Sequence, residues 1–182
     1  MTRRHWISAA LVILTEGYLY IRYVQLGAEF HFWLHGLFGA ALGLAALTAV
    51  RMLRSHRRGS DPARGVVAPW EGGFLGHLYS AVPDVLFLGF GVLHVLWMDV
   101  FAFHITLHFI PAPLVAMLML FVLTLGAYGL AASRHPGSAA GTLAVASGVL
   151  VVAVLLAEPI PNSLTDLHID RGFGLCPVRG HG

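Results

Sequence analysis

Long apolar runs restrict the fold of this chain more than any other feature of its sequence. Five runs are each close to the ~20 residues that a helix needs to cross the hydrocarbon of a bilayer. They cover residues 6–23, 32–52, 85–110, 114–132 and 141–157. Open sheets leave unsatisfied edges in lipid, and the runs are too long for strands. We therefore predict an all-α fold, an integral membrane helical bundle of about five transmembrane helices.

The arginines predict the orientation of this bundle. Arg3 and Arg4 precede the first run, the segment 51–64 holds five more arginines, and Arg134 lies between the fourth and fifth runs. Because positively charged loops stay on the cytoplasmic side, these segments and the N-terminus are expected in the cytoplasm. Residues 1–158 then form the transmembrane domain, and residues 159–182 form an extracytoplasmic C-terminal tail.

Composition excludes several classes of function. Charged residues make up 11% of the chain, against roughly a quarter in soluble domains. The net charge of +2 is too small for a nucleic-acid-binding surface, so nucleic acid is not expected as a partner. All basic residues other than histidine are arginine, which excludes a cofactor held by a lysine Schiff base. A single cysteine, Cys176, cannot form an internal disulfide or a thiolate cluster.

Eleven histidines are unusual in a chain that is 57% hydrophobic. Ionisable side chains are costly inside a bilayer, so histidines in apolar segments are candidates for function. A single histidine of this kind is as easily a structural residue that hydrogen-bonds a carbonyl group as a cofactor ligand. The spacing between the histidines is what favours the ligand interpretation. Those in or at the ends of apolar segments are His5, His31, His35, His77, His94, His104 and His108.

One pair of histidines has a spacing suited to haem. His94 and His108 are 14 residues apart in the third predicted helix, which places both rings on nearly one face, roughly 21 Å apart along the axis. One helix then offers an imidazole near each membrane surface, as two haems in the two leaflets require. In the predicted orientation, His5 is the partner of His94, and His35 or His31 is the partner of His108. This arrangement predicts two b haems.

The same residues also suggest direct metal binding. His31/His35 and His104/His108 are two HxxxH pairs, each on one face of a predicted helix and both near the outer surface. Four converging imidazoles suit zinc, copper or a di-iron centre. Under this hypothesis the chain is a metal-dependent membrane enzyme in which a metal-bound water reacts. The carboxylates considered as further ligands are Asp99 and Glu29.

Short motifs occupy the first two predicted helices. The first helix opens with Arg4-His5-Trp6, and the second contains His35-Gly36 and ends at Arg51. In these motifs the chain resembles the bacterial cytochrome b561 superfamily, particularly the b-type cytochrome subunits of membrane-bound nickel-iron hydrogenases and formate dehydrogenases. Further matching positions in the first helix are Ala9 and Gly17.

The resemblance implies a cofactor, partners and a location. It implies that His5 and His35 are axial haem ligands, and the spacing of His94 and His108 matches the paired-ligand helix of the family. It implies electron transfer between quinone and partner redox subunits of a membrane complex. It also implies a multi-pass protein of a bacterial-type inner membrane.

A polar group precedes the third predicted helix. A quinone headgroup needs a hydrogen-bond donor and a proton acceptor, which His77 and Asp84 would supply, with Tyr79 and Ser80 close by. A polar segment that hydrogen-bonds its own turn is the simpler hypothesis. The sequence thus leaves three functions open: a di-haem cytochrome, a metal-dependent membrane enzyme using the two HxxxH pairs, and a non-catalytic membrane subunit.

Overall fold

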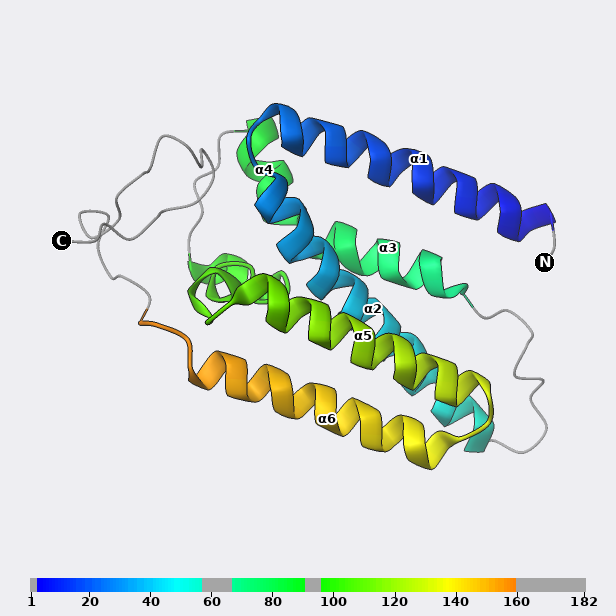
Figure 1. Ribbon diagram of the computed structural model, residues 1–182. Helices are drawn as coiled ribbons and strands as arrows, with labels where there is room; N and C mark the ends of the chain where they lie inside the picture. Colours follow the sequence, from blue (N-terminus) through cyan, green and yellow to red (C-terminus); the bar gives the residue numbers. More distant parts are fainter. Residues whose placement is uncertain (1–2, 57–66, 91–95, 160–182) are drawn as a thin grey trace.

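The computed structural model describes residues 3–56, 67–90 and 96–159, and all regular elements within these ranges are helical (Figure 1). Four helices are long and apolar enough to cross a membrane, which confirms the predicted class of helical membrane bundle. These four are α1 (Arg3–Gln25), α2 (Glu29–His56), α5 (Pro113–Ala132) and α6 (Pro136–Leu155). The shorter elements are α3 (Pro69–Ser80), α4 (Val82–Phe90) and the 3-10 helices η1 (Leu96–Val100) and η2 (Thr106–Phe109).

Helix α2 lies at the centre of the bundle. It packs against α3 on one side and α5 on the other, and α6 covers α5. Leu34 and Phe38 of α2 pack with Met117 and Leu120 of α5 in the main apolar core, which Ala146 of α6 completes. In a bilayer, where lipid is as apolar as these side chains, their van der Waals packing holds α2, α5 and α6 together.

Helix α1 lies at the edge of the bundle and presents an apolar surface. Of its residues only Tyr23 is buried, whereas Trp6, Ile13 and Leu14 are each exposed by about two thirds. Large apolar side chains exposed along a whole helix are unstable in water and suit hydrocarbon. The bundle is therefore suited to a lipid bilayer.

The third predicted helix, residues 85–110, is not a continuous helix. Helix α4 ends at Phe90, and η1, η2 and turns follow within residues 96–110. Ala102 and Phe103 have φ angles of +60° and +53°, which a right-handed helix does not accept. His108 is therefore not on a helix with His94, which itself lies outside the described residues. The argument from a spacing of 14 residues on one helix was wrong.

Helix α3 carries the chain back along the bundle in place of that helix. It runs beside α2 from the end where α1 begins toward the end where α1 and α2 join (Figure 1). Consequently α6 ends at the opposite end of the bundle from the start of α1. The assignment of the α1 end to the cytoplasm remains a prediction.

The contact between α2 and α3 depends on facing glycines. A Cβ atom on Gly39 would clash with the carbonyl of Gly76, and a Cβ atom on Gly43 would clash with the carbonyl of Gly72. Small residues at such positions let two helix backbones approach closely in a membrane. The close approach also brings the ring of His77 against Gly36.

Substitution of one of these glycines tests the packing. We expect Gly76→Ala to lower the free energy of unfolding by about 1–3 kcal/mol, because the added methyl overpacks the contact with the α2 backbone. The matched control is Gly126→Ala in α5, where a Cβ atom meets nothing within 4 Å. The control should retain wild-type stability or gain up to about 1 kcal/mol, because alanine favours a helix more than glycine does. Denaturant unfolding in detergent micelles measures both. Equal stabilities of the two variants would contradict the packing.

Candidate metal centre

The first two turns of α2 supply two buried histidines. Gly27, with a φ angle of +66°, lies in the turn between α1 and α2, and α2 begins two residues later at Glu29. His31 and His35 follow one helical turn apart, so their side chains leave α2 on the same face. Their exposed fractions are only 2% and 0%. The structure thus places this pair on one face of a helix, as the HxxxH spacing predicts.

The other two histidines come from the irregular segment after α4. His104 is fully buried, and His108 in η2 is partly exposed. The Asp99 carboxylate organises this segment, since it accepts hydrogen bonds from the backbone N–H groups of Ile105 (2.6 Å) and Thr106 (2.9 Å) and from the Thr106 hydroxyl (2.6 Å). Asp99 was considered from the sequence as a metal ligand, whereas here its oxygens bind the loop that carries His104.

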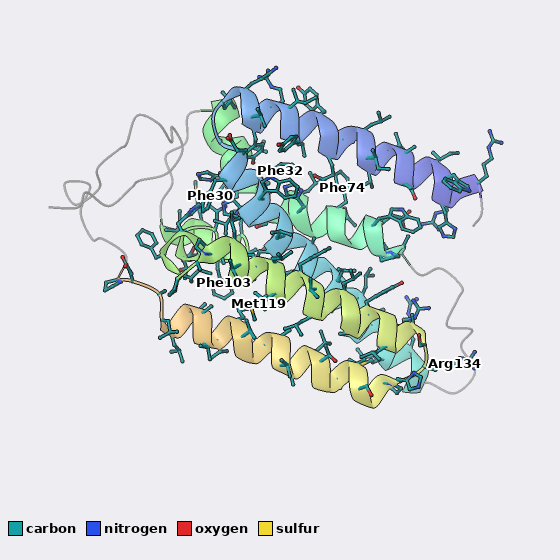
Figure 2. The ribbon with its side chains drawn as sticks, viewed as in Figure 1. Phe30, Phe32, Phe74, Phe103, Met119 and Arg134 are labelled. Atoms are coloured by element: carbon teal, nitrogen blue, oxygen red, sulfur yellow. The ribbon has the colours of Figure 1, made fainter. Side chains whose placement is uncertain are left out.

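The four imidazole rings converge at the end of the bundle where α1 and α2 join. The rings of His35 and His104 are stacked, with centroids 3.9 Å apart and planes 12° from parallel. The His108 ring centroid lies 4.7 Å from that of His31 and 5.2 Å from that of His35. Phe30, which contacts His108, lies at the same end of the bundle as Phe103 (Figure 2). The two HxxxH pairs therefore meet, although only the first pair lies on an α-helix.

A fully buried carboxylate, Asp84 of α4, completes the cluster. Its Oδ1 lies 3.3 Å from His104 Nε2 and 3.7 Å from His31 Nδ1. Its Oδ2 accepts a hydrogen bond of 2.9 Å from the Tyr23 hydroxyl. Sequence reasoning grouped Asp84 with His77 and missed this role. The available signal was an acidic residue inside an apolar run, which must find a polar partner in the protein interior.

The donor atoms of these residues are close enough to bind metal ions. One group, His31, His35 and His108, has its donor atoms all within 4.8 Å of one another, and so does a second group, His35, Asp84 and His104. Within the part of the chain that the structure describes, neither ring nitrogen of His31 or of His35 has a hydrogen-bond partner. Buried nitrogens without partners are costly, and a bound ion would satisfy them.

His5 and His77, two other predicted site residues, lie outside this cluster. His5 is near the start of α1, at the other end of the bundle, and its ring meets Trp70 edge-on with centroids 5.8 Å apart. His77 Nδ1 lies 2.9 Å from Glu16 Oε1. This pair borders a cavity of about 620 Å³ between α1, α2, α3 and α5. The structure thus brings together five of the candidate residues and leaves these two elsewhere.

Comparison of the chain with protein-family models, curated proteins and solved structures found no match. The resemblance of the first two helices to the cytochrome b561 superfamily therefore remains a prediction. The argument for function depends on the geometry of the site.

Removal of the Asp99 carboxylate tests how the loop is held. We expect Asp99→Ala to speed hydrogen exchange at the amides of Ile105 and Thr106 by roughly 10–100-fold, because an unsatisfied group costs about 1–3 kcal/mol. Exchange measured by mass spectrometry on the full chain in detergent reports this change. Glu29→Ala is the control, since Glu29 is exposed at the start of α2. Unchanged exchange in Asp99→Ala would show that the loop does not depend on this carboxylate.

Proposed function

We propose that the chain is a metal-dependent integral membrane enzyme. Its metal centre is formed by His31, His35, Asp84, His104 and His108. The observation that carries the proposal is the convergence of these side chains from three distant segments, with donor atoms within 4.8 Å in each of two groups. The ring nitrogens of His31 and His35 that lack hydrogen-bond partners among the described residues support it.

The donor set indicates which ions and which chemistry fit. Imidazole with carboxylate suits zinc, copper or iron, whereas magnesium and calcium prefer oxygen ligands. Three protein ligands leave coordination positions open, as in catalytic sites, while structural zinc sites are closed by four. His35, Asp84 and His104 have the two-histidine, one-carboxylate composition of non-haem iron oxygenase sites. An ion bound here would supply Lewis acidity and open positions for a substrate.

Ring spacing favours bare ions over haem. Two axial imidazoles must hold a macrocycle between them, and His35 instead has His104 stacked at 3.9 Å and His108 at 5.2 Å. His5, the other ligand implied by the family resemblance, is at the opposite end of the bundle from this cluster. These positions support the metal-dependent enzyme more than the di-haem cytochrome.

A second candidate function, electron transfer to a quinone, is favoured by the cavity beside His77. Glu16 engages His77 Nδ1, and among the described residues the buried Nε2 has no hydrogen-bond partner. A quinone headgroup could bind at Nε2, with its apolar tail in the 620 Å³ cavity. Under this hypothesis the chain would hold a haem or a redox-active metal ion, and electrons would pass through it between the quinone and partner redox subunits.

Metal content and optical spectra of the purified protein test the proposal. We expect the full chain, purified in detergent, to retain zinc, copper or iron and to lack haem bands in a reduced-minus-oxidised spectrum. His31→Ala and His104→Ala should each weaken metal retention by at least about tenfold, because each removes a ligand. His5→Ala is the control and should retain wild-type metal content.

Two outcomes would overturn the enzyme proposal. Sharp α and Soret bands that disappear in His35→Ala would identify a cytochrome. If the purified protein holds neither metal nor haem, even after incubation with Zn²⁺, Cu²⁺ or Fe²⁺, a non-catalytic membrane subunit would be the remaining function.

A further inference from the structure

His35 belongs to both groups of candidate metal ligands. It shares one group with His31 and His108 and the other with Asp84 and His104. Its exposed fraction is 0%, and both of its ring nitrogens lack hydrogen-bond partners within the described residues. An imidazole ring has two nitrogens on different edges, so one side chain can bind two ions when the N–H proton of the neutral ring leaves as the second ion binds.

Asp84 also lies between the two groups. The same oxygen, Oδ1, is 3.3 Å from Nε2 of His104 in one group and 3.7 Å from Nδ1 of His31 in the other. The second oxygen, Oδ2, accepts the Tyr23 hydroxyl hydrogen bond. Tyr23 thereby acts as a positioning residue that directs Oδ1 toward the histidines.

From this geometry we propose that the cluster is a two-ion centre, with His35 and Asp84 between the ions. One ion would be held by His31, His108 and His35, and the other by His104, Asp84 and His35. This inference rests on the proposed metal centre and adds the number of ions and the residues that join them.

Charge explains why Asp84 should be the joining residue. Two divalent cations side by side repel each other, and the repulsion is strong in a buried site of low dielectric constant. A carboxylate between them lowers that repulsion, and Asp84 is fully buried at this position.

The number of ions bound by single variants tests the proposal. We expect equilibrium dialysis of the full chain in detergent against Zn²⁺ to give two tightly bound ions for the wild type and one for either His104→Ala or His108→Ala. Asp84→Asn keeps the side-chain shape and should also lose one ion, whereas His35→Ala should lose both. His5→Ala is the control and should keep two. Circular dichroism and gel filtration identify variants that fail to fold.

Electron paramagnetic resonance of protein loaded with Cu²⁺ gives a second, independent readout. Two adjacent Cu²⁺ ions couple, so the wild-type spectrum should lack the full signal of isolated ions. The His104→Ala variant should show the spectrum of a single isolated Cu²⁺. A fully uncoupled spectrum in the wild type with two bound ions would overturn the shared positions of His35 and Asp84.

The proposed function and the two-ion centre fail differently. One ion per wild-type chain, lost alike in His104→Ala and His108→Ala, would overturn the two-ion centre and leave the metal-dependent enzyme intact. The absence of any bound ion in the wild type would overturn both.

Discussion

The close approach of α2 and α3 at facing glycines is the contact on which the rest of the structure depends. With no side chains between Gly39 and Gly76 or between Gly43 and Gly72, the two backbones touch. Helix α3 leads directly into α4, whose Asp84 lies 3.7 Å from His31 of α2. Bulkier residues would separate the helices and move this carboxylate away from the histidines of α2.

The polar cluster carries an energetic cost that a bound metal ion would offset. A carboxylate and several imidazoles are buried at one end of an otherwise apolar bundle. Tyr23 satisfies one oxygen of Asp84, whereas the nitrogens of His31 and His35 find no hydrogen-bond partner among the described residues. Polar groups in this state destabilise a fold unless another partner is supplied. Positive ions satisfy imidazole nitrogens and a carboxylate together, which gives the metal hypothesis its physical basis.

The HxxxH spacing of His104 and His108 correctly predicted that these residues meet His31 and His35. It did so by assuming a helix, which is not the local structure found here. An HxxxH pair favours one face of a helix, and the two pairs do meet. However, the second pair is held by left-handed residues at 102 and 103 and by the hydrogen bonds of Asp99. The apolar composition of this segment favours a helix. The hydrogen bonds that replace the helix join the Asp99 carboxylate to backbone N–H groups six and seven positions further along the chain. Periodicity alone does not detect such bonds.

The sequence by itself determined four membrane helices, α1, α2, α5 and α6. A long apolar segment must satisfy its own backbone groups in lipid, and a helix does so within one segment. The sequence also determined that His31 and His35 share a face, because helical geometry places residues four apart on one side. Only the tertiary structure decided that Asp84 joins them. Its hydrogen bond with Tyr23 links residues 61 positions apart, and its approach to His104 crosses an irregular segment. Such contacts depend on how whole helices pack, which no local pattern specifies.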